Sequence, residues 1–181
     1  MGETSQLAAK NQEQALIGKL MQVRFFNRLS AKHIQLLLKL AQPMSVDADE
    51  ALWMEGDPCT GLYILVQGRL VIVEGGREVR HMVPINPVGE LPLLTGAVHP
   101  DEVVAHSPCL LLQIPRKTLE TVLLKSTDLC QRICRNVVSE LADELQMVND
   151  DIGDVARRKA QIEAQIKDAE SEFNGLRMTR G

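Results

Sequence analysis

No run of apolar residues in this sequence approaches the roughly 20 that span a bilayer, and the polar start MGETSQLAAKNQEQ is unlike a secretory leader. A basic block is lacking too, because the twenty Lys and Arg residues are spread along a chain whose formal net charge is −4. Such a charge distribution is not that of a DNA-binding surface. These absences predict a cytoplasmic protein with no membrane contact and no direct nucleic-acid partner.

Cysteine is scarce, and its spacing contains no C-x-x-C pair and no histidine at zinc-ligand distance. We interpret the four cysteines as reduced thiols that fill small apolar spaces; they are Cys59, Cys109, Cys130 and Cys134. The last two are four apart on an expected helix, so a redox or metal pair would also fit. No histidine accompanies a Ser or Cys nucleophile in a catalytic motif. The sequence therefore predicts a protein that is not an enzyme and has no metal site.

Helical patterns enclose a central region of short strands. Apolar residues recur at helical spacing over 6–23, and Ser30 can cap a second helix over 31–41. From Pro43 to Pro115 the period changes to two, with turn residues such as Gly68 at short intervals. This order predicts a mainly β fold with flanking helices, a jelly-roll β-barrel followed by a long coiled-coil helix. The expected parts are N-terminal helices (1–42), a jelly-roll domain (43–125) and a dimerisation coiled coil (126–181).

Two series of residues in the C-terminal segment each repeat every seven positions, which is the 3.5-residue period of a coiled coil. β-branched residues at several core positions favour a parallel homodimer, and Lys159 is tolerated there because its stem reaches solvent. Gly153 weakens the helix by about 1 kcal/mol. A single amphipathic helix packed on its own domain is the alternative. The predicted seam comprises Cys134, Val138, Leu141, Leu145, Val148, Ile152, Val155, Lys159, Ile162, Ile166, Ala169, Phe173 and Leu176.

Three stretches carry a resemblance to a known family: FFNRLS (25–30), EGDPCTGLYILVQGRLVIV (55–73) and PVGELPLL (87–94). Over about residues 22–145 the chain resembles the cyclic-nucleotide-binding domains of the catabolite activator and the protein kinase A regulatory subunit. The resemblance implies an eight-stranded jelly roll in which a Gly-Glu turn opens a short helix, the phosphate-binding cassette. It also implies that Gly89 lies beneath the nucleotide and that Glu90 accepts a hydrogen bond from the ribose 2′-hydroxyl.

The stretch after the cassette departs from the family pattern, in which an Arg followed by a small residue binds the cyclic phosphate. An ungapped count from Glu90 places His99 at the Arg position and Pro100 after it. Histidine is largely neutral at pH 7, and proline lacks the backbone amide. Asp101 and Glu102 add negative charge nearby. If a ligand binds at all, the candidate contacts are Gly89, Glu90, Leu91, His99 and Asp101.

Two functions are compatible with these observations. The first is a non-catalytic dimeric regulatory adaptor without a cofactor, which has lost ordinary cyclic AMP and cyclic GMP binding and acts through a protein partner. The second is a receptor for a cyclic nucleotide or cyclic dinucleotide that couples the ligand to the dimer helix. Catabolite-activator relatives carry a helix-turn-helix after that helix, and none follows here. A role in transcription is therefore expected only if the sequence is a piece of a longer regulator.

Overall fold

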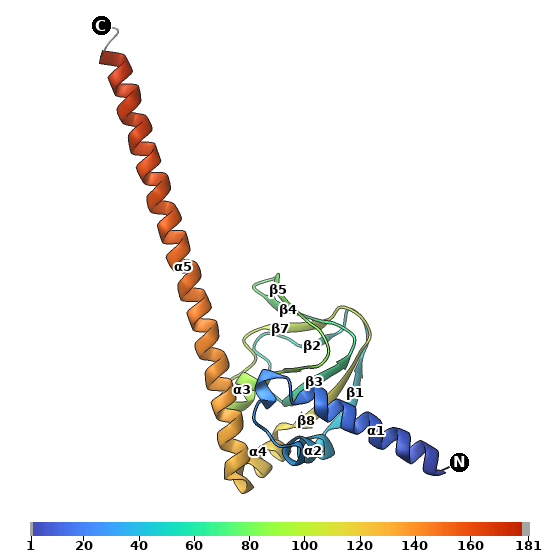
Figure 1. The fold of residues 1–181 in the computed structure, drawn as a ribbon. Helices are drawn as coiled ribbons and strands as arrows, with labels where there is room; N and C mark the ends of the chain where they lie inside the picture. Colours follow the sequence, from blue (N-terminus) through green and yellow to red (C-terminus); the bar gives the residue numbers. More distant parts are fainter. Residues whose placement is uncertain (1, 179–181) are drawn as a thin grey trace. The chain divides into compact units, whose positions relative to one another are not determined.

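A computed structural model describes the backbone of residues 2–178, with side chains described for 11–143, 145–153, 155, 157–159 and 161. By its internal contacts the chain forms two compact units, Met1–Val138 and Ser139–Gly181. The elements follow the expected order of helices, strands and helices (Figure 1). Within the described residues, none of the helices combines the length and apolar character needed to cross a membrane.

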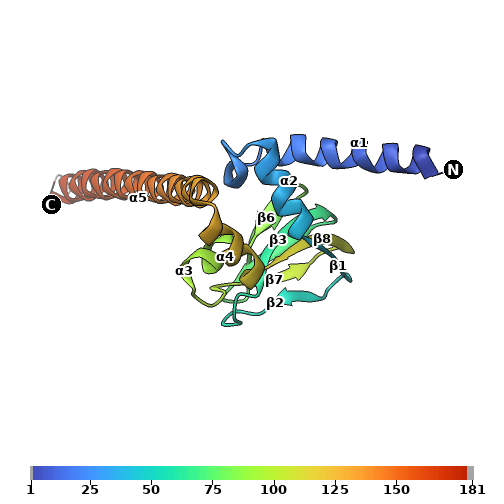
Figure 2. The same ribbon diagram turned by 90° about the horizontal axis from the view of Figure 1, so that it is seen from below.

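The N-terminal segment contains the helix α1 (Gly2–Leu20), the 3₁₀ turn η1 (Arg24–Phe26) and the helix α2 (Ala31–Leu40). Ser30 caps α2 as predicted, since its hydroxyl accepts the backbone N–H of His33 at 3.2 Å. The helix expected over 6–23 ends at Leu20, because the next residues turn so that Phe25 and Phe26 are buried edge to face. Figure 2 shows α2 lying between α1 and the sheet that contains β8.

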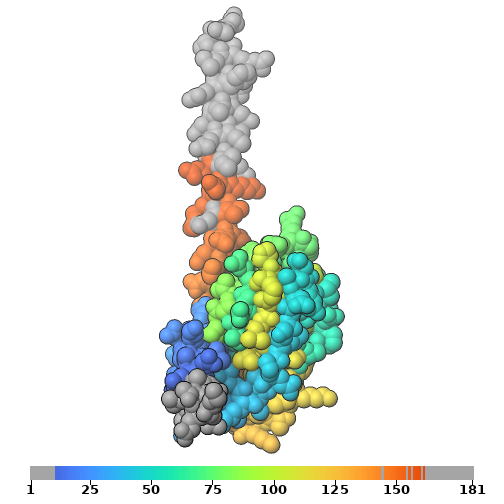
Figure 3. Space-filling view, turned by 90° about the vertical axis from the view of Figure 1, so that its right-hand side faces the viewer, coloured from blue at the N-terminus to red at the C-terminus, as the bar shows by residue number. Residues whose placement is uncertain are grey.

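The jelly roll consists of two antiparallel four-stranded sheets, with strand orders β1-β8-β3-β6 and β2-β7-β4-β5. Figure 3 shows the yellow segment that includes β8 beside the cyan segment that includes β1. "Mainly β" fits this region and not the whole chain, because more of the described residues lie in helices than in strands. The strands are β1 (Gln42–Val46), β2 (Ala51–Trp53), β3 (Gly61–Gln67), β4 (Leu70–Glu74), β5 (Arg77–Met82), β6 (Asn86–Val88), β7 (Glu102–Ala105) and β8 (Cys109–Pro115).

The core lies between the two sheets, where apolar side chains from both inner faces meet. Leu65 and Leu111 come from one sheet, Leu70 and Val103 from the other, and each is fully buried. Gly68 has a φ of +96°, which a glycine adopts without strain, and it separates β3 from β4 as the sequence predicts. Along β7 the buried residues alternate with half-buried ones, whereas β3 contains five consecutive buried residues.

After the jelly roll come α4 (Arg116–Lys125) and α5 (Thr127–Met178). The first three turns of α5 belong to the first unit, because Leu129 and Ile133 are buried there. The buried amide of Asn136 donates to the backbone carbonyls of Phe25 at 2.8 Å and Asn27 at 2.6 Å. These bonds attach the first part of α5 to η1 and to the residue that follows it.

In the second unit, α5 exposes apolar side chains at the predicted seam positions. Leu145 is 65% exposed, Ile152 61% and Val155 68%. Val148 and Lys159 are also exposed, Leu141 is half-buried, and Val138, the last residue of the first unit, is exposed as well. Five predicted seam residues lie outside the described side chains: Ile162, Ile166, Ala169, Phe173 and Leu176. The long helix is present, and the second strand of a coiled coil remains a prediction.

Candidate functional site

The cassette turn is built on Gly89, which precedes the helix α3 (Glu90–Thr95) and has a φ of +86°. A β-carbon at this position would lie 3.4 Å from the Trp53 ring and 3.5 Å from the His99 ring. Glycine therefore lets the turn adopt a left-handed conformation close to both rings. Pro92 lies in the first turn of α3, where the missing N–H has no helical partner to lose.

His99 is held rigidly by backbone hydrogen bonds to the segment that follows β2. Its N–H donates to the carbonyl of Asp57 at 2.9 Å, and its own carbonyl accepts from Gly56 at 2.9 Å. The imidazole is only 2% exposed and is stacked on Trp53, with ring centroids 3.9 Å apart and planes 15° apart. The position where the family pattern has a cation thus carries a ring packed into the protein.

Trp53 lies at the centre of this site, at the end of β2. Its indole N–H donates to a carboxylate oxygen of Asp101 at 3.2 Å, and its other neighbour is Tyr63, with ring centroids 5.4 Å apart. The Tyr63 hydroxyl is anchored in turn by Thr60 at 2.6 Å and by the Gln113 amide at 3.0 Å. We name Trp53, Tyr63 and His99 the aromatic row.

The electrostatics of the site do not favour an anion. Burial lowers the pKa of His99 below its ordinary value of 6.5, while the negative charges of Asp101 and Asp57 act in the opposite direction. The imidazole Nδ1 is buried without a hydrogen-bond partner among the described residues. His99 is therefore neutral at pH 7, and the charges that act on it are those of two carboxylates.

The structure brings together three of the five candidate ligand contacts, since Gly89, His99 and Asp101 all meet at Trp53. Glu90 and Leu91 are half-buried in the first turn of α3. Trp53 and Tyr63 were missed by sequence reasoning, although each is the single residue of its kind in the chain. The occurrence of each residue type only once was the signal in the sequence that could have drawn attention to these two rings.

The cysteines take no part in the aromatic row. Cys59 and Cys109 are buried, in agreement with their interpretation as apolar fillers, and burial raises the pKa of the Cys59 thiol. Cys130 is half-buried. Cys134 is exposed, so its interpretation as a buried filler is wrong; its solvent-facing position on α5 is also a seam position. Among the described residues no cluster of three or more His, Cys, Asp or Glu side chains has the arrangement of a metal site.

We expect the protein to lose stability as the pH falls below about 6.5, the ordinary pKa of histidine. The folded state resists protonation of His99, whereas the unfolded chain takes up the proton at that ordinary pKa. The contribution of His99 to the free energy of unfolding is present above pH 6.5. It is lost as the pH falls from 6.5 to the lower pKa that His99 has in the folded state, by at most about 1.4 kcal/mol per pH unit. Urea unfolding of the wild type and of His99→Gln at pH 7.5 and 5.5 measures it. Equal losses in both proteins would contradict the assignment to His99.

Comparisons with known proteins agree with this geometry. A model of the cyclic nucleotide-binding domain family matches residues 43–126. A comparison with curated proteins gives no significant match. The solved structure of the Thermus thermophilus catabolite activator protein aligns with a TM-score of 0.63 and 20% identity, over 74% of this chain and 63% of that one. The sensor domain of the transcriptional regulator DNR from Pseudomonas aeruginosa aligns with a TM-score of 0.59 and 18% identity, over 74% of this chain and 93% of that one.

The regulatory domain of Toxoplasma gondii protein kinase A, crystallised with cyclic AMP, has a higher sequence identity of 30%. It aligns with a TM-score of 0.56 over 61% of this chain and 44% of that one. This chain spans 63% to 65% of the length of the catabolite activator protein and of two similar structures from Ruegeria (Silicibacter) pomeroyi, so the activities of those whole proteins do not transfer directly. The family match and the fold agree on the same segment of the chain. Residues 43–126 therefore match the cyclic nucleotide-binding domain family, in a fold similar to those of the catabolite activator protein and the protein kinase A regulatory domain.

Proposed function

We propose that this protein is a non-catalytic dimeric regulatory adaptor of the cytoplasm whose cyclic nucleotide-binding domain no longer binds cyclic AMP or cyclic GMP. In this proposal the domain presents a surface to a protein partner, and the seam of α5 holds two copies together. The observation that carries the proposal is the aromatic row, in which a neutral, buried His99 stacks on Trp53 at 3.9 Å.

Charge is the first reason why a cyclic phosphate would bind poorly beside this histidine. An arginine would provide a permanent positive charge and a planar fork of donors, whereas neutral imidazole provides one donor at most. Asp101 is committed to the indole N–H of Trp53 and brings a negative charge to the same place. Desolvating a phosphate without a counter-charge costs several kcal/mol, more than a hydrogen bond from the ribose to Glu90 would return.

Lack of space and of backbone donors is the second reason. The His99 ring already fills the position next to Gly89, with its Cε1 atom 3.5 Å from where a β-carbon would lie. Pro100 offers no N–H, and the N–H of His99 itself is used by Asp57. A ligand phosphate would have to displace a stacked ring and would find fewer backbone donors there than the family pattern implies.

A receptor for a cyclic nucleotide or cyclic dinucleotide is the second candidate function. The intact cassette turn favours it, because Gly89 keeps its left-handed conformation and Glu90 opens α3 as the family resemblance implies. In that case the ligand would have to move His99 off Trp53 before its phosphate could enter. The two functions therefore differ in whether any cyclic nucleotide binds the wild-type protein.

Calorimetric titration of the full chain with cyclic AMP, cyclic GMP and cyclic dinucleotides separates the two functions. We expect flat traces for the wild type up to about 1 mM ligand, where binding would be worth only about 4 kcal/mol. The double variant His99→Arg/Pro100→Ala restores the cation and the amide, and we expect it to bind cyclic AMP at least tenfold more tightly than the wild type. Pro100→Ala alone is the matched control, because it restores the amide without the charge. A micromolar isotherm for the wild type that is lost in Glu90→Ala would refute the adaptor and establish the receptor.

A further inference from the structure

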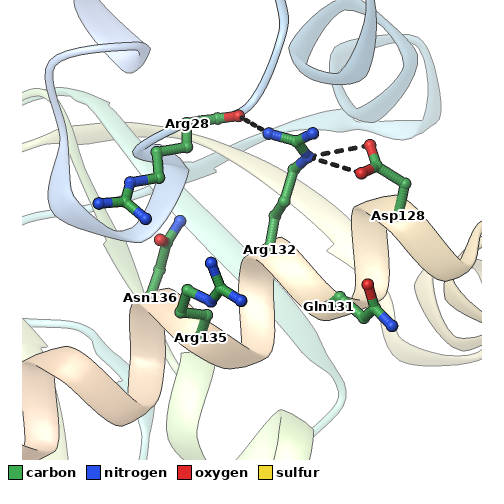
Figure 4. Close-up of a pocket in the computed structure, with 6 residues that line it drawn as sticks. All are labelled: Arg28, Asp128, Gln131, Arg132, Arg135 and Asn136. Atoms are coloured by element: carbon green, nitrogen blue, oxygen red, sulfur yellow. Dashed lines mark hydrogen bonds and ion pairs between the residues drawn. The ribbon is translucent and has the colours of Figure 1, made fainter.

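The first unit contains a polar pocket away from the cassette, between the segment that follows η1 and the first turns of α5 (Figure 4). Its cavity measures about 140 Å³. No residue of the cassette turn or of the aromatic row contributes to it. The residues that line it are Arg28, Asp128, Gln131, Arg132, Arg135 and Asn136.

The walls of the pocket are fixed by hydrogen bonds between segments far apart in the sequence. The Arg132 guanidinium donates to the backbone carbonyl of Arg28 at 2.8 Å, and its Nε lies 2.9 Å from both carboxylate oxygens of Asp128. Asn136 holds the same segment through the carbonyls of Phe25 and Asn27. Arg28 itself has a φ of +61°, which is uncommon for a residue other than glycine. The pocket is therefore a built feature of the fold and not a gap between loose side chains.

The charges around the pocket are unbalanced. Among the residues whose side chains are described, Asp128 is the only carboxylate that lines the pocket, and this group is already paired with Arg132 and lies 3.5 Å from His33. The guanidinium groups of Arg28 and Arg135 make no hydrogen bond or ion pair with any residue that the structure describes. Figure 4 shows both groups on the side of the pocket away from Asp128. Two positive charges thus face one small cavity in a chain whose net charge is negative.

We propose that this pocket binds a phosphate group, as inorganic phosphate or as a phosphate monoester. Two unpaired guanidinium forks supply the charge and the donor geometry that a dianionic phosphate takes up in bidentate pairs. Gln131 is a further polar residue at the wall, on the same side as Asp128. The volume is well below the roughly 300 Å³ at which pockets for drug-sized ligands begin, so the site accepts a phosphate group and not a whole cyclic nucleotide.

The bound phosphate would connect two parts of the first unit. Arg28 lies on the segment between η1 and α2, and Arg135 lies on α5, so one anion between them removes their mutual repulsion and joins the two elements. Because α5 continues into the second unit, the site is placed at the base of the predicted dimer helix. Phosphate binding is expected to raise the unfolding temperature of the first unit, since it binds only the folded state.

Calorimetry of the full chain with inorganic phosphate and with a short phosphoserine peptide, in a buffer free of other oxyanions, tests the site. We expect saturable binding by the wild type and a loss of at least tenfold in affinity for Arg135→Gln and for Arg28→Gln. Arg77→Gln is the matched control, because it removes the same charge from an exposed position on β5. Its affinity for phosphate is expected to equal that of the wild type.

The two probes also identify the source of the phosphate group. Tighter binding of the peptide than of inorganic phosphate would indicate a phosphorylated side chain, and the reverse order would indicate a free anion. Thermal unfolding gives an independent readout, in which phosphate raises the midpoint of the wild type and not that of Arg135→Gln. Absence of saturable binding to both probes, or an equal loss in Arg77→Gln, would overturn the proposal.

Discussion

Ile152→Glu is expected to convert the proposed dimer into a monomer. Ile152 is 61% exposed in the single chain and occupies a core position of the predicted seam, where two copies of it would pack against each other. Burying each side chain is worth about 1.5–3 kcal/mol, and the substitution also brings two carboxylates together in an apolar interface. The dissociation constant should therefore rise by about three powers of ten or more. Light scattering coupled to size exclusion, over a range of concentrations, measures the mass of each form.

Met147→Glu is the matched control for this substitution. Met147 is exposed, at 68%, and lies one position before Val148, outside both series of seam residues. The same change from an apolar side chain to a carboxylate should leave the dimer intact there. A wild type that is monomeric at high concentration, or an Ile152→Glu variant that remains dimeric, would contradict the predicted seam. Fluorescence emission of the single tryptophan, Trp53, reports whether the first unit stays folded in the monomer.

The parts of the fold that were predictable from the sequence are those encoded by neighbouring residues. Gly68 interrupts a long apolar run, and most residues of the strands on both sides of it are buried or half-buried, so β3 and β4 could be located. The start of α2 is also encoded locally, because the Ser30 hydroxyl accepts a hydrogen bond from the backbone N–H of His33, which is only three residues further along the chain. The Gly-Glu turn before α3 is also local, because the unusual φ belongs to Gly89 itself.

The aromatic row could not be predicted because it depends on how the two sheets pack. Trp53 and His99 are 46 residues apart, and their stacking follows from the backbone bonds between His99 and the segment after β2. A count along the sequence predicts that His99 stands where the family pattern has an arginine, but it does not predict that the ring is buried against an indole. The phosphate pocket is even less visible in the sequence, since Arg28 and Arg135 are brought together only by the packing of α5.

Trp53→Ala is expected to destabilise the protein by about 3–5 kcal/mol, the range observed when a buried aromatic residue is truncated. The indole is 7% exposed and lies between the rings of Tyr63 and His99, so its removal leaves a cavity in the centre of the aromatic row. It also leaves Asp101 without its donor. Urea unfolding followed by circular dichroism measures the loss. Trp53→Phe is the matched control, because it keeps a ring in place without the N–H, and it should cost less than the alanine variant.

The Trp53→Ala variant also separates the two proposed obstacles to binding of a cyclic phosphate, which are missing positive charge and lack of space. Trp53→Ala lets water reach the His99 ring, so the pKa of His99 should rise toward its ordinary value and the loss of stability below pH 6.5 should shrink. It creates space next to Gly89 but supplies no positive charge. If missing charge is what prevents binding, Trp53→Ala will give a flat calorimetric trace with cyclic AMP, while His99→Arg/Pro100→Ala will not. Binding by Trp53→Ala would instead show that the stacked rings alone close the site, and the cassette would then be an occluded receptor.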